Sequence, residues 1–90
     1  MNKSSERTAL TSAQLRAARA LIRWSAENLA RASAVGLTTI RRAELTDSET
    51  SMTAANDLAV RRALEDAGVE FIDENGGGAG VRLRKPHKSE

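Results

Sequence analysis

The sequence predicts a mainly helical fold of four helices that ends in a β-hairpin, and three observations support this prediction. The chain is rich in alanine, leucine and arginine, whereas strand-forming aromatic residues are limited to Trp24 and Phe71. Four segments between residues 11 and 68 carry apolar residues at helical spacing, and each follows a residue suited to cap a helix. After Gly68 the apolar residues fall at every second position, which is typical of strands.

The first helix is expected to run from Thr11 to about Arg23. The preceding residues 1–10 are largely polar and lack periodicity, so we expect a mobile arm there. Thr11 followed three positions later by Gln14 matches a capping box, in which each side chain satisfies a backbone N–H group of the other residue. The predicted apolar stripe of this helix consists of Leu15, Ala18, Leu21 and Ile22.

A break in the helical pattern at Ala34-Val35-Gly36 separates two short helices. Ser25 is expected to cap the first of them, in which Leu29 and Ala30 face inward. Gly36 can cap the next helix, Leu37 to about Leu45. On this helix Leu37 and Ile40 lie on one side, and the other sides carry Thr38, Arg41 and Arg42.

A polar loop over residues 46–52 leads to the fourth predicted helix. Thr53 caps this helix, which runs from Ala54 to Ala67 and offers Leu58 and Leu64 to the core. Gly68 ends it, because glycine takes a left-handed conformation at little cost.

Residues 69–85 are predicted to form the hairpin, and residues 86–90 form a tail. The strand sequences VEFI and VRLR are joined by DENGGGAG, a loose glycine-rich connection. One face of the hairpin is expected to hold Val69 and Phe71 opposite Val81 and Leu83. Since an isolated two-stranded hairpin is marginal in water, it should pack on the helices or pair with a second copy.

Composition excludes several classes of function. The chain has no cysteine, and its one histidine, His87, lies in the tail, so thiolate metal sites, a zinc site and a histidine-based catalytic triad lack their residues. We therefore expect no metal, no cofactor, no small-molecule substrate and no enzyme activity. No apolar run approaches the roughly 20 residues that cross a bilayer, so we expect no membrane association and a cytoplasmic location.

Two glycine-rich and acidic features also lack a catalytic pattern. GGGAG is not followed by a Gly-Lys-Ser/Thr ending and a helix, so it is interpreted as a hairpin tip rather than a phosphate loop. The acidic pairs Glu65-Asp66 and Asp73-Glu74 have no neighbouring base, nucleophile or metal ligand in the sequence, and are interpreted as solvated charge. Binding to single-stranded RNA is rejected, because the two aromatic residues are better explained as core.

The stretch QLRAARALIRWSAENLARASAVGLTTIRRAE resembles the Cro-type, lambda-repressor-like helix-turn-helix regulators, also called the xenobiotic-response-element family. The resemblance covers about Thr11 to Val69. It implies that Ala30, Val35 and Ile40 hold the two helices of the motif together. It also implies a structural salt bridge between Arg19 and Glu44, which would tie the first helix to the end of the third.

Several positions depart from the pattern of that family. Ala34 stands where the turn usually has glycine, at a cost of about 1 kcal/mol if the backbone keeps a positive φ. Ala26 replaces a glutamine that would bond a phosphate, and Leu37 stands where a polar base-reading residue is frequent. The loop after the third helix is acidic, with Asp47 and Glu49.

The resemblance implies a sequence-specific regulator of transcription, a repressor, that inserts helix 37–45 into the major groove of double-stranded DNA. The residues expected to contact bases are Leu37, Thr38, Arg41 and Arg42. Arginine is long enough to reach the O6/N7 edge of guanine, and threonine can contact a thymine methyl group. The residues expected to contact phosphates are Arg23, Ser25, Ala26 and Thr39.

A homodimer that reads two half-sites about 34 Å apart is expected, because one such module makes few contacts with DNA. The hairpin is the predicted dimer contact, through Phe71, Ile72, Val81 and Leu83. The alternative function is a protein-interaction module, such as an antitoxin-like partner protein, that keeps the same fold but has weakened DNA binding. The acidic loop and Ala26 motivate that alternative.

Overall fold

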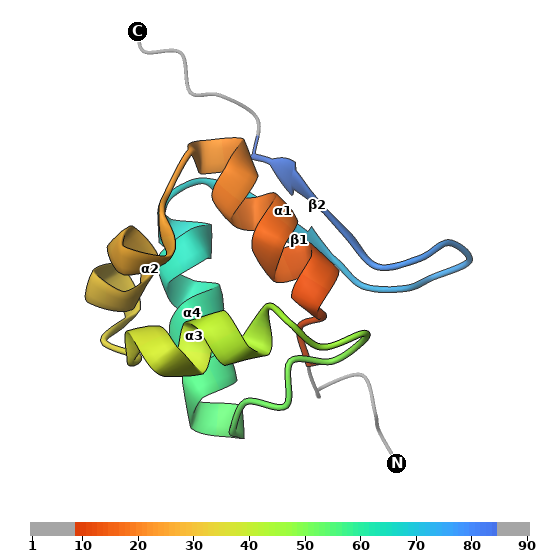
Figure 1. The fold of residues 1–90 in the computed structure, drawn as a ribbon. Helices are drawn as coiled ribbons and strands as arrows, with labels where there is room; N and C mark the ends of the chain where they lie inside the picture. The colour runs from red at the N-terminus through yellow and green to blue at the C-terminus, as the bar shows by residue number, and fades with distance from the viewer. Residues whose placement is uncertain (1–8, 85–90) are drawn as a thin grey trace, which may run out of the picture.

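A computed structural model describes residues 9–84, which form four helices and one two-stranded antiparallel sheet (Figure 1). The elements in chain order are α1 (Ser12–Ile22), α2 (Ala26–Ser33), α3 (Leu37–Ala43), α4 (Ala54–Asp66), β1 (Val69–Ile72) and β2 (Gly80–Leu83). The predicted mainly helical fold with a C-terminal hairpin is therefore confirmed. Most of the predicted arm and all of the predicted tail lie outside the described residues.

The predicted N-caps of α1, α2 and α4 are confirmed. The Thr11 side chain accepts a hydrogen bond from the backbone N–H of Gln14 at 3.0 Å, and the Gln14 side chain accepts one from the backbone N–H of Thr11 at 3.0 Å. Ser25 and Asn28 form the same reciprocal pair at the start of α2. Thr53 accepts from the backbone N–H of Asn56 at the start of α4. These caps satisfy backbone donors that have no partner within the helix, which fixes where each helix begins.

The predicted third helix is two residues too long, since α3 ends at Ala43 and not at Leu45. The backbone N–H of Leu45 bonds the carbonyl of Arg42 in a tightened last turn, and the Leu45 side chain is 81% exposed. The next residue, Thr46, contacts the hydroxyl of Ser12 on α1 through its own hydroxyl. The chain therefore leaves the helix toward α1, and burial of Leu45 offers no gain that would extend the helix.

The core lies between the four helices and the inner face of the hairpin. Its fully buried large side chains include Leu10, Leu15, Leu29, Ile40, Val60, Leu64 and Val69. The predicted arm is wrong at Leu10, which is buried and whose backbone N–H donates to the Asp57 carboxylate at 3.0 Å. The predicted core positions Leu21 and Leu58 are also wrong, because these side chains are 38% and 40% exposed.

The loop between α3 and α4 is held against the chain just before α1. The Ser12 N–H donates to the carbonyl of Ser48 at 2.8 Å, and the Thr50 N–H donates to the carbonyl of Leu10 at 3.1 Å. The Ser12 hydroxyl also donates to the carbonyl of Ala43 at the end of α3. This loop has almost no apolar side chains, so backbone hydrogen bonds rather than burial give it a fixed path beside α3.

The hairpin packs on α1 and α4, as Figure 1 shows for the blue strands beside α1. Its register pairs Val69 with Leu83 and Phe71 with Val81, which confirms the predicted shared face. The second strand begins at Gly80 and ends at Leu83, one residue earlier than the predicted VRLR. The amide of the buried Gln14 donates to the carbonyl of Ile72, the last residue of β1, at 3.4 Å and to the carbonyl of Gly80, the first residue of β2, at 3.0 Å.

On the α4 side, the guanidinium carbon of Arg61 lies 5.2 Å from the centre of the Phe71 ring, within the range of a cation–π contact. At the junction between α4 and β1, Gly68 has a φ of 111°, as expected for a helix stop that only glycine adopts readily. Within residues 9–84, no helix is long and apolar enough to cross a membrane.

Candidate functional site

The corner between α2 and α3 is built by a left-handed residue and a buried serine. Ala34 has φ 61° and ψ 24°, so the positive φ that the turn requires is carried by alanine. The hydroxyl of Ser33 donates to the carbonyl of Leu29 at 2.7 Å and accepts from the N–H of Val35 at 3.2 Å. Val35 is buried beyond the corner. Together these contacts fix the direction in which the chain enters α3.

The sides of α3 divide into a buried face and an exposed arc. Ile40 and Ala43 are buried, whereas Thr38, Arg41 and Arg42 are exposed. Because successive helical residues turn by about 100°, Arg41 and Arg42 lie about 60° to one side and about 40° to the other side of Thr38. Thr38 is thus at the centre of the exposed arc, and an arginine stands on each side of it.

Leu37 and Thr39 lie at the margins of the arc. Both are partly buried, and Leu37 packs against the core. Three of the five predicted DNA-contacting residues on α3, namely Thr38, Arg41 and Arg42, are therefore exposed, whereas Leu37 and Thr39 are partly exposed.

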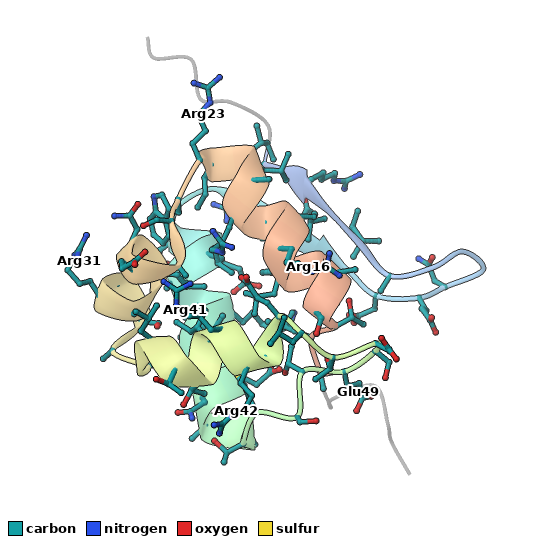
Figure 2. All side chains as sticks on the ribbon, in the orientation of Figure 1. Arg16, Arg23, Arg31, Arg41, Arg42 and Glu49 are labelled. Atoms are coloured by element: carbon teal, nitrogen blue, oxygen red, sulfur yellow. The ribbon has the colours of Figure 1, made fainter. Side chains whose placement is uncertain are left out.

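The two arginines of the arc have different surroundings. The Arg41 guanidinium donates to the Glu27 carboxylate in the first turn of α2 at 3.0 Å, and the two side chains are 57% and 52% exposed. Arg42 makes no ion pair or hydrogen bond with the described residues. In Figure 2, Arg41 lies on the side of α3 next to α2, and Arg42 lies on the opposite side. Arg42 is therefore the side chain on α3 that is available to an anion without losing a partner.

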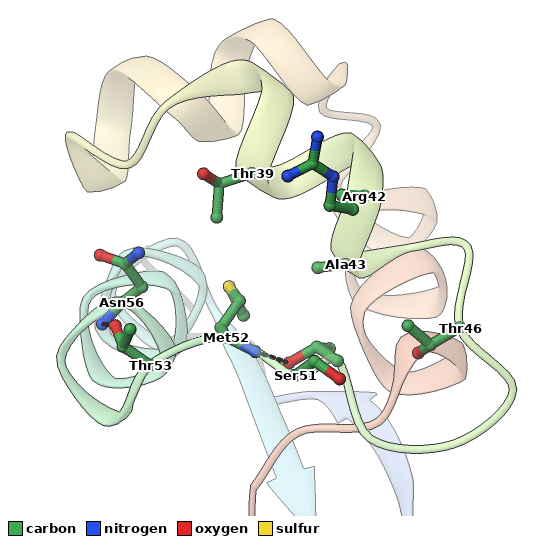
Figure 3. A pocket seen from close by; sticks show the side chains of 9 residues that line it. Thr39, Arg42, Ala43, Thr46, Ser51, Met52, Thr53 and Asn56 are labelled. Atoms are coloured by element: carbon green, nitrogen blue, oxygen red, sulfur yellow. Dashed lines mark hydrogen bonds between the residues drawn. The ribbon is translucent and has the colours of Figure 1, made fainter.

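A polar cleft of about 440 Å³ lies beside Arg42, between α3, the following loop and the start of α4 (Figure 3). Seven of its nine lining residues carry a hydroxyl, amide or guanidinium group, although carbon atoms contribute more of the lining surface than polar atoms do. The polar lining residues are Thr39, Arg42, Thr46, Thr50, Ser51, Thr53 and Asn56. No pattern in the sequence indicates this cleft, because its residues are separated by up to seventeen positions and meet only through the fixed path of the loop.

The predicted salt bridge between Arg19 and Glu44 is present. The Nε and Nη2 atoms of Arg19 donate to the two carboxylate oxygens of Glu44 at 2.6 and 2.8 Å, and Nη1 donates to the carbonyl of Trp24 at 2.8 Å. The hydrogen bond to Glu44 raises the pKa of the Arg19 guanidinium above the ordinary arginine value. With side chains only 22% and 11% exposed, this bidentate pair fixes the end of α3 against α1.

The residues predicted to contact phosphates do not form one patch with α3. Ser25 is exposed, but its backbone N–H and its hydroxyl oxygen are already used in the cap of α2. Ala26 is buried, with 7% of its surface exposed, and a phosphate contact at this position stays a prediction. Figure 2 shows Arg23 at the end of α1, far from Arg42. Thr39 is the predicted phosphate-contacting residue that lines the cleft.

The predicted dimer contact is divided between two environments. Phe71 and Val81 are partly buried against the core of their own chain, and their contact with a second copy stays a prediction. Ile72 is half-buried, and Leu83 is 51% exposed. The outer face of the hairpin carries an ion pair between Arg82 and Glu70 at 3.1 Å.

Some residues that position the site were not recognised in the sequence. Gln14 was predicted as a cap only, although its amide also holds the hairpin. Ser12 joins α1 to the end of α3, and Glu27 binds the arginine of the exposed arc. Ser12, Glu27 and Gln14 are polar residues whose partners lie on other elements, and the spacing of residues along one helix gives no signal for such pairs.

The chain was compared with protein-family models, with curated proteins and with solved structures, and none of the three comparisons finds a match.

Proposed function

We propose that the protein is a sequence-specific regulator of transcription that binds double-stranded DNA as a Cro-type, lambda-repressor-like helix-turn-helix protein, and that α3 enters the major groove. The observation that carries this proposal is the exposed arc of α3, in which Thr38 stands between Arg41 and Arg42 opposite a fully buried Ile40. The proposal places the protein with its DNA in the cytoplasm, where binding at a promoter would repress transcription.

The dimensions of α3 suit a major groove. An α-helix with its side chains is about 10–12 Å across, which fits a groove about 12 Å wide. Arg42 is assigned to the O6/N7 edge of a guanine, since it has no competing partner among the described residues, and Thr38 to a thymine methyl group or a base acceptor. The bidentate Arg19–Glu44 pair supports the proposal because it holds α3 at a fixed angle to α1.

The polar cleft beside Arg42 suits the phosphate backbone that borders the groove. Thr39, Thr53 and Asn56 line it with hydroxyl and amide groups, which can donate hydrogen bonds to phosphate oxygens. A DNA strand that passes along this cleft would place Arg42 at the edge of the major groove. Phosphate contacts, which position the protein on the duplex, and the base contact of Arg42 would then come from neighbouring residues.

We further propose that the protein acts as a homodimer through the edge of β2. The Arg84 N–H bonds the carbonyl of Gly68 in the hairpin register, so the N–H and C=O groups of Val81 and Leu83 point to the outer edge of β2. They make no hydrogen bonds with the described residues. Antiparallel pairing of β2 with the same strand of a second copy, centred on Arg82, would add about four backbone hydrogen bonds.

Exposed leucines at the same edge support this dimer. On α1, Leu21 lies two helical turns beyond Gln14, which is a distance of roughly 10 Å along the helix. On β2, Leu83 lies three residues beyond Gly80, which is also roughly 10 Å along the strand. Since Gln14 binds the carbonyl of Gly80 and the two elements run in the same direction, Leu21 lies level with Leu83. A second copy would cover both side chains. The Arg82 side chains that meet at the centre are each neutralised by Glu70.

Selection from a random pool of duplexes, followed by fluorescence anisotropy, tests the proposed function. We expect an enriched inverted repeat that binds at least about a thousandfold better than random duplex at moderate salt. Arg42→Ala should weaken binding to the selected duplex by about fivefold to 150-fold and relax the preference at one base pair of each half-site. Equal and weak binding of all duplexes, unchanged by Arg42→Ala, would refute the proposal.

The second candidate function is a protein-interaction module with weakened DNA binding. Two observations favour it. A carboxylate, Glu27, pairs with Arg41 on the arc of α3, and the Leu45 side chain just beyond the end of α3 is 81% exposed. If the duplex selection enriches no sequence, this function becomes the better explanation of the exposed surface of α3.

A further inference from the structure

Several polar side chains around the cleft beside Arg42 have no partner in the protein. The side chains of Thr39, Arg42, Ser51 and Asn56 line the cleft and form no hydrogen bond or ion pair with any described residue. The hydroxyl oxygen of Thr53 accepts the N–H of Asn56, which leaves the hydroxyl proton available to a ligand. Figure 3 shows these groups on opposite walls, since Thr39 and Arg42 come from α3 and the other side from the start of α4.

The charge of the cleft favours an anion. Arg42 is the one charged residue among those that line it in the part of the chain that the structure describes. Asp57, in the first turn of α4, does not line the cleft, and its carboxylate accepts a hydrogen bond from the N–H of Leu10. Guanidinium, amide and hydroxyl groups all donate hydrogen bonds. A ligand that suits the cleft therefore carries negative charge and accepts several hydrogen bonds.

The loop wall of the cleft is fixed by contacts that a ligand would not disturb. The Thr50 N–H donates to the carbonyl of Leu10 at 3.1 Å, and the Ser12 N–H donates to the carbonyl of Ser48 at 2.8 Å. The Thr46 hydroxyl also donates to the carbonyl of Glu49 at 2.8 Å. Because the loop is already ordered by its backbone, binding of a ligand does not have to offset the entropy of ordering it.

The cleft offers more than one phosphate of a DNA strand can use. A phosphodiester has two free oxygens and a single charge, whereas a phosphate monoester has three free oxygens and a charge of about −1.5 to −2 at pH 7. The unpartnered donors outnumber two oxygens. The volume of about 440 Å³ also falls in the range of roughly 300–1,000 Å³ that is typical of small-molecule sites. Met52 and Ala43 supply apolar atoms for the carbon body of such a ligand.

We infer that this cleft binds a small phosphate monoester, and that the bound ester releases the protein from DNA. The ester phosphate engages Arg42 and occupies the place proposed for a phosphate of the duplex, so the ester and the duplex exclude each other. The ester is bound as a ligand and is not converted. The release from DNA rests on the proposed function, whereas the binding of the ester does not.

An NMR titration with ribose 5-phosphate at constant ionic strength tests the binding. We expect a Kd of about 1 mM or lower, with the largest amide shift changes at Thr39, Ser51 and Asn56. Dimethyl phosphate, which has the charge and the free oxygens of a diester, and ribose, which has no phosphate, should each bind at least about tenfold more weakly. Inorganic phosphate should bind at least about fivefold more weakly than the ester. Equal binding of ribose 5-phosphate and dimethyl phosphate, or of ribose 5-phosphate and inorganic phosphate, would overturn the inference.

Variants of the two walls test where the ester binds. Arg42→Gln should weaken binding of ribose 5-phosphate at least about tenfold, because a charge-assisted contact is lost. Asn56→Leu should weaken it about two- to tenfold, and it keeps the backbone N–H that Thr53 caps. Arg16→Gln is the matched control for charge: it lies on α1, outside the cleft (Figure 2), and should have less than about a twofold effect. Circular dichroism should confirm that each variant is folded. An equal loss on Arg16→Gln would show an effect of net charge and would overturn the inference.

Competition measured by fluorescence anisotropy tests the release from DNA. Ribose 5-phosphate at about nine times its Kd should lower the affinity of each subunit for the selected duplex about tenfold, whereas ribose at the same concentration should not change it. An ester that binds but leaves duplex affinity unchanged would overturn the release. A protein that binds its selected duplex but not the ester would overturn the inference and leave the proposed function intact. A protein that binds the ester but no duplex would overturn the proposed function and confirm the ligand site.

Discussion

Replacement of Ala34 by glycine should stabilise the protein, and the structure gives the magnitude. Ala34 holds φ 61° and ψ 24° at the end of α2, and its side chain is exposed, so no packing is lost when the methyl group is removed. A left-handed conformation costs an L-residue about 1–2 kcal/mol. Glycine removes this cost, but the greater freedom of the unfolded chain offsets about 0.4–1 kcal/mol. The net gain in the free energy of unfolding should therefore be about 0.5–1 kcal/mol.

Urea denaturation followed by circular dichroism measures this gain. The midpoint should rise with an unchanged m-value, and the melting temperature should rise by about 2–8 °C for a domain of this size. Ala32→Gly is the matched control, because Ala32 is also exposed but lies within α2. There the same substitution should destabilise by about 0.5–1 kcal/mol. If the two variants lose stability equally, the reasoning from the left-handed turn is refuted.

Three further predictions concern the hairpin. Gln14→Glu keeps the side-chain oxygen that accepts a hydrogen bond in the cap of α1, but it removes the amide that donates to the hairpin carbonyls. Amide hydrogen exchange should therefore accelerate in β1 and β2 while α1 stays protected. Unchanged exchange in the two strands would contradict this prediction. Leu83→Lys should convert the dimer to a monomer in light scattering, whereas Leu58→Lys, which changes an exposed leucine on α4, should not; two dimeric variants would exclude the β2 edge. The hydrogen bond from Arg82 lowers the pKa of Glu70, so the pair should stabilise the protein above the ordinary glutamate pKa, and this stability should be lost as the pH falls through the lowered pKa. In an NMR titration, Arg82→Gln should return the pKa of Glu70 to the ordinary glutamate range. A Glu70 titration that Arg82→Gln leaves unchanged would refute the pairing.

Local features of the fold were predictable from the sequence. The caps at Thr11, Ser25 and Thr53 depend on residues at most three positions apart, and the stop at Gly68 depends on one residue. The alternation of apolar residues in the hairpin correctly predicted which side chains share one face, because successive strand residues point to opposite faces.

Exposure of apolar residues was predicted less well. On α4, Leu58 lies about 160° from the buried Val60, so it faces solvent although leucine is a common core residue. On α1, Leu21 lies on the same side as Gln14 and faces the hairpin, whose short strands leave it partly uncovered. In both helices the face that meets the core is decided by neighbouring elements, which the periodicity of one segment cannot reveal.

In the candidate site, too, features within one helix were predictable from the sequence and contacts between elements were not. The exposure of Thr38, Arg41 and Arg42 follows from their place on α3 opposite Ile40. The pairing of Arg41 with Glu27 depends on the angle between α2 and α3, and the cleft beside Arg42 depends on the path of the loop. The Arg19–Glu44 pair was predicted only through the resemblance to a known family, since its residues are 25 positions apart.

In the proposed function, the exposed arc of α3 is the surface that contacts duplex DNA. Amide chemical-shift changes, measured by NMR as a duplex is added to the labelled protein, test it most directly. We expect the largest changes at Thr38, Thr39 and Arg42 and in the first turn of α4, with β2 little affected. Changes centred instead on Arg82 and Arg84 of the hairpin, with α3 unperturbed, would contradict the claim.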